Sequence, residues 1–150
     1  MKVIIISGTP GTGKTTTAKK LAREKNYEYI DVAKLIKENK LSSGYDKKRK
    51  TNIIDVKKLN KFLINLTNIY KKDKKVKGMI IDSHLSHYLP PKYVDLCIIT
   101  KCNLKTLQKR LKKKHYHKEK IRENLDAEIF DICLYEAKEL GHKIKIMYTD

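Results

Sequence analysis

The chain has 150 residues, of which 40% are hydrophobic and 35% are charged, and its formal net charge is +18 at pH 7. This length suits a single domain with a buried core. The apolar run at residues 3–6 is too short for a signal peptide or a membrane span, so we expect no membrane association. Three cysteines without C-x-x-C spacing predict buried, reduced thiols and a cytoplasmic location.

The positive charge comes almost entirely from lysine, since arginine occurs only at positions 23, 49, 110 and 122. A field of this sign attracts polyanions such as RNA and nucleotides. A lysine-rich composition also arises from genomic bias or from adaptation to heat. The composition alone does not decide whether the lysines serve to bind polyanions or reflect such a bias. Contact with RNA is compatible with either origin of the charge.

Apolar runs alternate with amphipathic segments along the chain. β-branched runs predict buried strands, and apolar residues at helical spacing predict the helices between them. The expected strands are residues 3–6, 27–30, 79–82, 94–100 and 143–147, and the expected helices are 14–25, 32–40, a long helix after 55, 104–112 and one marked by residues 121–133. Residues 41–51 and 83–92 are expected to be loops. This order predicts one α/β domain over residues 1–150, with a five-stranded parallel sheet between two helical layers.

A phosphate-binding loop follows the first expected strand. It satisfies the pattern G-x-x-x-x-G-K-[ST] and lies between a strand and a helix, as the motif of a P-loop NTPase requires. Its glycines let backbone N–H groups turn inward around an anion, and the following helix presents its positive end. Lys14 is expected to bridge the β- and γ-phosphates of ATP, Thr15 to hold Mg²⁺ and Thr16 to donate to the α-phosphate. The expected ATP-binding residues of this segment are Gly8, Gly11, Gly13, Lys14, Thr15 and Thr16.

Polar side chains follow two other expected strands. Asp82 ends the third strand, where a carboxylate binds Mg²⁺; the alternative is a helix cap or a surface aspartate. His84 either orients water or the γ-phosphate, or is a hydrogen-bonded loop histidine. His87 is expected at the surface, and the two histidines lack the further ligands of a zinc site. Asp31 either positions the phosphate acceptor or caps a helix. We expect Lys14, Asp82 and His84 to carry the catalysis.

The order of the motifs described above, together with the further blocks given below, resembles that of the adenylate kinase isoenzyme six family. This family is also called the coilin-interacting nuclear ATPase proteins, and the resemblance is to its archaeal type. The resemblance runs from about residue 3 to residue 140. The Asp-x-His signature and the blocks after it are more specific than the phosphate loop alone. The matching blocks are residues 8–16, Asp31-Val32, Gly44-Tyr45-Asp46, Ile54-Asp55, Asp82-Ser83-His84 with Pro90, residues 120–124 and residues 128–130.

The resemblance implies a nucleoside-monophosphate-kinase fold, with a monophosphate-binding region at about residues 31–54 and a short lid at about 113–123. It implies a broad-specificity kinase that converts ATP and AMP into two ADP with Mg²⁺, and ATPase activity as well. It also implies a role in maturation of small-subunit rRNA, through contact with a platform ribosomal protein. Asp31 and Lys37 lie in the implied monophosphate-binding region.

Two segments, with three changed positions, depart from the family pattern. Lys114-His115-Tyr116 replaces the usual Arg-Gly-Tyr of the lid, and Lys37 replaces an arginine for the AMP phosphate. Lys114 still brings positive charge to the triphosphate, but it does not make the bidentate contact of arginine. An alternative function is therefore an ATPase-type ribosome assembly factor with little AMP kinase activity. A small-metabolite P-loop kinase is disfavoured, because arginines that would hold carboxylate substrates are scarce.

Overall fold

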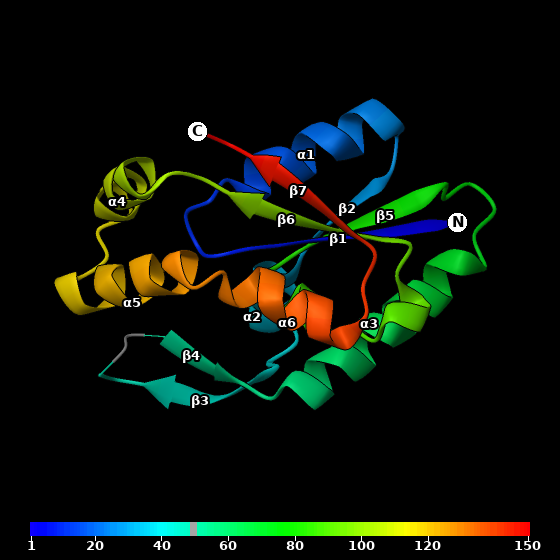
Figure 1. The fold of residues 1–150 in the computed structure, drawn as a ribbon. Helices are drawn as coiled ribbons and strands as arrows, with labels where there is room; N and C mark the ends of the chain where they lie inside the picture. The colour runs from blue at the N-terminus through cyan, green and yellow to red at the C-terminus, as the bar shows by residue number, and fades with distance from the viewer. Residues whose placement is uncertain (49–50) are drawn as a thin grey trace.

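The computed structural model describes residues 1–48 and 51–150. Its centre is a five-stranded sheet of order β2-β5-β1-β6-β7, in which all neighbouring strands are parallel (Figure 1). The strands are β1 (Lys2–Ser7), β2 (Glu28–Asp31), β5 (Gly78–Asp82), β6 (Leu96–Lys101) and β7 (Ile144–Tyr148). The α/β fold with five parallel strands is confirmed, and the strand ends lie within two residues of their predicted positions.

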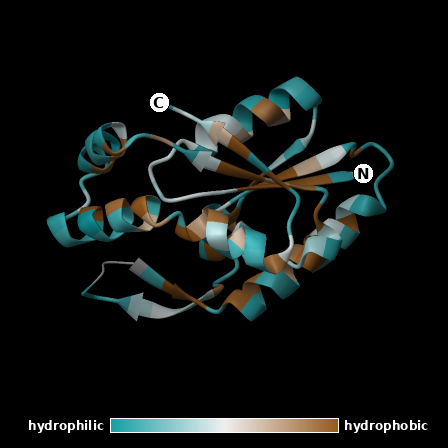
Figure 2. Cartoon of the chain, viewed as in Figure 1, coloured by the Kyte–Doolittle hydropathy of each residue, from teal (hydrophilic) through white to brown (hydrophobic). Residues whose placement is uncertain are grey.

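Helices cover both faces of this sheet (Figure 1). α1 (Lys14–Lys25) packs on one face, where Ala18 and Ala22 are buried against isoleucines of β1, β5 and β6. α2 (Val32–Glu38), α3 (Val56–Lys71) and α6 (Ile132–Leu140) enclose the larger core on the other face. Hydrophobic residues concentrate on the central strands in Figure 2, as a parallel sheet buried on both faces requires.

Two further helices lie beyond the carboxyl end of β6 (Figure 1). α4 (Leu104–Lys113) and α5 (Lys118–Ile129) form a small core of their own, in which Leu107 and Leu111 contact Ile121 and Leu125. The side chain of Asn103 accepts a hydrogen bond of 2.8 Å from the backbone N–H of Thr106, which confirms the predicted cap of α4. The predicted lid, at about residues 113–123, therefore spans the end of α4, the connection after it and the first half of α5.

Three local predictions are wrong. The expected loop at 41–51 contains β3 (Ser42–Asp46), which pairs antiparallel with β4 (Thr51–Ile54); positions 49–50 lie outside the described residues. β3 is mostly polar and exposed, so it carries no apolar alternation to reveal a strand. The expected helix at 121–133 is two helices, because Asp131 adopts a φ of 52° between α5 and α6. The segment after β5 includes two short 3₁₀ turns, η1 (Ser86–Tyr88) and η2 (Pro91–Tyr93).

The three cysteines are free, and burial raises the pKa of the Cys97 thiol to about 12. Cys97 and Cys102 are buried as predicted, whereas Cys133 is half-buried. Within residues 1–48 and 51–150, no helix has the length and apolar character needed to cross a membrane.

Candidate active site

The phosphate loop lies between β1 and α1 and depends on glycine at three positions. Gly8, Gly11 and Gly13 have φ angles of 143°, 94° and 87°. A Cβ at Gly8 would lie 2.6 Å from Thr100 Oγ1, and one at Gly11 would lie 2.9 Å from Leu107. Only glycine adopts these angles at low cost, and only glycine fits these contacts. The sheet and α4 therefore hold the loop from outside and leave its concave side open.

Lys14 folds back across this loop. Its Nζ donates hydrogen bonds of 3.0 Å to the carbonyl oxygen of Gly8 and 3.2 Å to that of Thr9. Burial of the ammonium lowers the pKa of Lys14 to about 8, and the positive charge of Lys114 adds to this effect. The negative charge of Asp82 opposes it. The ammonium is thus dehydrated beside the loop, where phosphate oxygens can replace the two carbonyls as its partners.

Asp82 accepts two hydrogen bonds on one carboxylate oxygen. Its Oδ2 lies 2.9 Å from Thr15 Oγ1 and 2.7 Å from the hydroxyl of Tyr29, which both donate to it. Hydroxyl and carboxylate oxygens suit Mg²⁺, which takes few protein ligands and completes its shell with phosphate and water. Across the described residues, no three His, Cys, Asp or Glu side chains are grouped to hold an ion. Thr15 and Asp82 together therefore fit Mg²⁺ better than a metal that needs an all-protein shell.

The loop opens into a cleft with a volume of about 1120 Å³. The phosphate loop and α1 form its floor, and Lys14, Thr15, Thr16, Asp82 and His84 all lie in its lining. The predicted lid contributes Lys113, Lys114, Tyr116 and Lys120 to this lining, and β2, α2 and β4 contribute Asp31, Ala33, Ile36, Asn52 and Ile54. The structure thus brings Lys14, Asp82 and His84 together in one cleft. The rest of the cleft lining comes partly from the predicted lid and partly from β2, α2 and β4.

The two predicted acceptor-side residues lie in different places. Asp31 lines the cleft, and its side chain also accepts a hydrogen bond of 3.2 Å from Lys34 N, so it caps α2. Lys37 is exposed on α2, and the described lining of the cleft includes Ile36 instead. Contact between Lys37 and a substrate phosphate stays a prediction.

His84 lies in the cleft on the segment that follows β5. His84 is exposed as a whole residue, but the protein around its imidazole partly removes water from the ring, and this desolvation lowers the pKa of His84 to about 4. The positive charges of Lys14 and Lys120 act in the same direction. The imidazole is therefore neutral at pH 7 and retains a nitrogen lone pair that can accept a hydrogen bond.

Lys120, in the predicted lid, is a cation of the cleft lining that the sequence patterns did not single out. The ammonium of Lys120 lies 4.3 Å from the centroid of the Tyr116 ring, and both residues line the cleft. These residues are four positions apart across the start of α5, which is the only local signal for their contact. His115 has a φ of 60°, a left-handed conformation that glycine adopts freely and other residues adopt less often.

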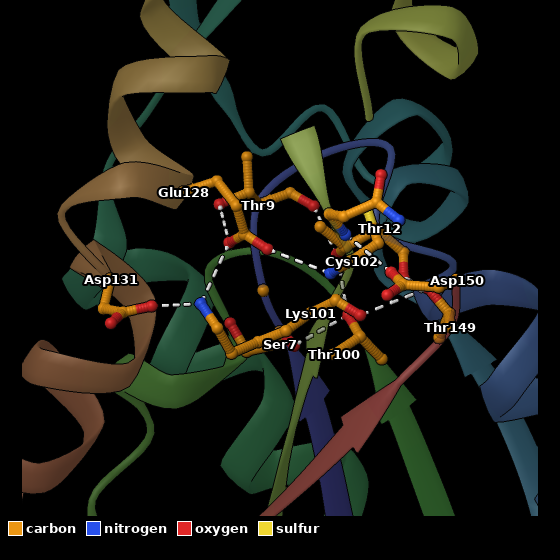
Figure 3. A network of polar contacts seen from close by, with 12 residues as sticks. Ser7, Thr9, Thr12, Thr100, Lys101, Cys102, Glu128, Asp131, Thr149 and Asp150 are labelled. Atoms are coloured by element: carbon orange, nitrogen blue, oxygen red, sulfur yellow. Dashed lines mark hydrogen bonds and ion pairs between the residues drawn. The ribbon is translucent and has the colours of Figure 1, made fainter. Parts of the chain in front are cut away.

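A buried carboxylate joins the lid helix to the phosphate loop (Figure 3). Glu128, near the end of α5, accepts hydrogen bonds from Thr9 Oγ1 at 3.2 Å and from the backbone N–H of Cys102 at 3.1 Å. The Nζ of Lys101 lies 3.5 Å from the same carboxylate and also pairs with Asp131. Thr9 and Glu128 are 119 positions apart, so no local pattern could predict this contact.

The end of β7 supports the loop from its other side. Thr149 Oγ1 donates a hydrogen bond of 2.6 Å to the carbonyl oxygen of Thr12. The guanidinium of Arg110 donates to Gly11 O at 3.3 Å and to Thr149 Oγ1 at 3.0 Å. A Cβ at Gly13 would lie 3.2 Å from Thr149. Arg110 and Thr149 both line the cleft, so a ligand on the loop also meets these two residues.

Comparisons with known proteins agree with this geometry. A family model described as an AAA domain matches residues 4–131. The "Putative adenylate kinase" of Methanocaldococcus jannaschii is 38% identical over 147 residues, which cover 98% of this chain and 78% of that protein. The "Adenylate kinase isoenzyme 6 homolog" of Schizosaccharomyces pombe is 40% identical over 137 residues, covering 91% of this chain and 74% of that protein.

Among solved structures, a shikimate kinase from Acinetobacter baumannii in complex with shikimate matches with a TM-score of 0.62. The match covers 100% of this chain and 86% of that chain at 12% identity, which shows a shared P-loop kinase fold and nothing about substrate. The identity and coverage of the sequence relatives show that the chain belongs to the adenylate kinase isoenzyme 6 family.

Proposed function

We propose that this protein is a nucleoside monophosphate kinase that converts ATP and AMP into two ADP. The division of its cleft carries the proposal. The volume of about 1120 Å³ exceeds the range of roughly 300–1,000 Å³ typical of sites for one small molecule. The phosphate loop and lid line one part, and α2 with β4 lines the other. Two nucleotides can therefore meet over the phosphate loop.

The chain contributes charge and position to the transfer. The ammonium of Lys14 would neutralise the β- and γ-phosphate oxygens, and Thr15 with Asp82 would hold Mg²⁺. When bound, Mg²⁺ supplies charge neutralisation between those phosphates. In-line phosphoryl transfer needs little proton transfer from the protein, because most of the catalysis comes from alignment and electrostatic stabilisation. The neutral imidazole of His84 can accept a hydrogen bond from a water molecule in the cleft, but not from the AMP phosphate, which has no proton to donate at pH 7.

The part of the cleft that α2 and β4 line, where the nucleoside monophosphate would bind, can accommodate more than one base. Ala33, Ile36 and Ile54 present apolar surface there, and Asn52 adds one amide. Apolar contacts discriminate weakly between ligands of similar size, whereas a site that hydrogen-bonds each edge of a base discriminates strongly. This lining supports broad specificity among nucleoside monophosphates.

A second candidate function is an ATPase that acts in assembly of the small ribosomal subunit. Of the described residues that line the cleft, Arg110 is the one arginine, and its guanidinium is hydrogen-bonded to Gly11 and Thr149. An AMP phosphate would thus meet no free guanidinium from these residues, which favours water as the acceptor. The net charge of +18 supports contact with rRNA, and we propose a platform ribosomal protein as a second partner. Free thiols support a cytoplasmic setting.

One assay separates the two functions. The protein is incubated with ATP and Mg²⁺, with and without AMP, and the nucleotides are separated and counted. The kinase forms two ADP for each AMP consumed, and parallel reactions with CMP, UMP and dAMP measure its breadth. Phosphate release that is indifferent to AMP would instead identify the ATPase. Lys14→Ala should abolish either activity, whereas Lys20→Ala, on the exposed face of α1, should retain it.

A further inference from the structure

Glu136 is a carboxylate in the cleft lining to which the proposed reaction gives no part. The other acidic side chains of the described lining have places already: Asp82 fits Mg²⁺, Asp31 caps α2, and Glu123 lies on α5 within the predicted lid. Glu136 lies on α6, and its side chain is 31% exposed. A negative charge repels the phosphates of both nucleotides. The part of a ligand that meets Glu136 is therefore not a phosphate.

Two aromatic side chains of η1 fix the direction of this carboxylate. The hydroxyl of Tyr88 donates a hydrogen bond to Oε2, and Nε2 of His87 lies 3.6 Å from Oε1. The His87 side chain is 1% exposed, although the sequence predicts a surface residue, because α6 packs against η1 and covers it. Each carboxylate oxygen can accept two hydrogen bonds. The contacts with η1 thus leave Glu136 able to accept a further hydrogen bond from a group in the cleft.

α6 places Glu136 away from the phosphate loop. Cys133, one turn earlier on α6, hydrogen-bonds through its thiol to Ser7, the last residue of β1. The His87 ring stands between Ser7 and Glu136, since its Nδ1 lies 2.7 Å from Ser7 Oγ and its Nε2 faces Glu136 Oε1. In a nucleoside monophosphate the base is the part farthest from the phosphate. Its position away from the loop therefore suits Glu136 to meet the base.

Apolar side chains near Glu136 suit the faces of a base. Ile36, Ile54 and Leu85 line the cleft and pack on the same core as Cys133 of α6. Binding sites for small molecules combine such apolar surface with a few polar groups that fix orientation. A carboxylate accepts hydrogen bonds and donates none. An amine at the edge of a base can donate to Glu136, whereas a carbonyl oxygen in the same place would face it without a proton between them.

We infer that Glu136 is a specificity-determining residue for the phosphate acceptor: its carboxylate accepts a hydrogen bond from the exocyclic N6 amine of AMP. The apolar surface admits bases of different size, and the carboxylate adds a preference for the base that carries this amine. The inference rests on the proposed function, because it takes the acceptor to be a nucleoside monophosphate. A site that hydrogen-bonds one group of a substrate rejects an analogue without that group far better than apolar contact does.

Two acceptors that differ at one group test this contact. IMP has the shape of AMP but carries an oxygen in place of the amine. In the wild-type protein we expect kcat/KM for AMP to exceed that for IMP by about tenfold or more, because IMP loses a hydrogen bond to a charged acceptor. Glu136→Gln presents either an amide oxygen or an amide NH₂ to the base, so this ratio should fall to about one to two. Glu139→Gln changes an exposed residue of the same helix and should keep the wild-type ratio.

The ratio of the two acceptors separates specificity from a general structural effect. A variant that is merely less stable loses activity toward AMP and IMP alike, so its ratio does not change. A wild-type ratio near one, or an unchanged ratio in Glu136→Gln, would overturn the inference. Parallel reactions with dAMP test the ribose. If Glu136→Gln changed the ratio of AMP to dAMP by the larger factor, the carboxylate would contact the sugar, and the inference would be overturned as well.

Binding measurements distinguish this inference from the proposed function. Titration calorimetry with AMP and with IMP gives the same comparison without phosphoryl transfer. A wild-type protein that prefers AMP through Glu136 but transfers no phosphate would refute the kinase and leave the contact in place. A protein that phosphorylates AMP and IMP equally well would leave the kinase in place and refute this role of Glu136.

Discussion

The hydroxyl of Tyr29 donates a hydrogen bond of 2.7 Å to Oδ2 of Asp82. The strands that carry these residues, β2 and β5, are neighbours in the sheet, so the contact fixes the carboxylate next to Thr15. We expect Tyr29→Phe to lower the free energy of unfolding by about 1.5 kcal/mol, since a hydrogen bond to a charged group is lost. The Mg²⁺ concentration for half-maximal activity should rise several-fold. Tyr27→Phe is the control, and an equal response of the two variants would contradict the assignment.

Affinity for ATP should depend on pH through Lys14. Burial lowers the pKa of this ammonium to about 8 in the free protein. Below that pH the group is already charged when ATP arrives, whereas above it binding must take up a proton. We therefore expect the Kd for ATP to be flat below pH 7 and to rise by up to about tenfold per pH unit above pH 8.

Titration calorimetry between pH 6.5 and 9.5, in buffers of different ionisation enthalpy, checks both the affinity and the proton uptake. Lys14→Arg remains charged over this range and should show no such rise if it still binds. A flat profile in the wild-type protein would mean that Lys14 does not contact the phosphates.

Lys120 should contribute more to turnover than its exposed neighbours in the lid. Lys120→Met keeps an apolar side chain of similar length beside Tyr116 but removes the charge from the cleft. We expect kcat to fall by about 10- to 100-fold, because the transferring phosphoryl group loses a nearby cation. Lys118→Met removes an exposed charge at the start of α5 and should have little effect. Steady-state kinetics at saturating ATP measures both, and equal activity in both would exclude this role for Lys120.

Glu128 should contribute to the free energy of unfolding mainly through its buried contacts and only slightly through the stability of its own helix. Glu128→Ala removes the carboxylate that Thr9, Lys101 and the backbone of Cys102 share. Breaking a buried charge pair of this kind costs about 3 kcal/mol, and denaturant unfolding measures the loss. Glu139→Ala, on an exposed position of α6, should cost about 0.5 kcal/mol or less. Similar values for the two variants would show that the buried pair adds nothing.

The sequence predicted the phosphate loop and Asp82 because local patterns mark both. A glycine-rich turn between a strand and a helix can be recognised from a few residues. Asp82 could be placed beside it because the carboxyl ends of parallel strands lie at the same edge of the sheet. His84 was found by its spacing from Asp82. These residues follow directly after parallel strands, so the order of strands and helices along the chain is enough to predict where they lie.

The residues that support the site were missed for the opposite reason. Tyr29, His87 and Glu128 make their contacts with partners 53, 80 and 119 positions away. No periodicity or spacing carries that information, since each residue type is common in unrelated settings. The break at Asp131 was missed because no glycine or proline marks it, and an aspartate only occasionally adopts a positive φ.

Thr149 and Thr12 meet across 137 positions of the chain. A ribosome releases the polypeptide from its amino terminus, so residues 8–15 emerge first and their support from β7 emerges only with the last residues described. Until then the turn at Thr12 and Gly13 lacks the neighbour that confines it. During translation, the phosphate loop should therefore reach its final geometry only after β7 has docked.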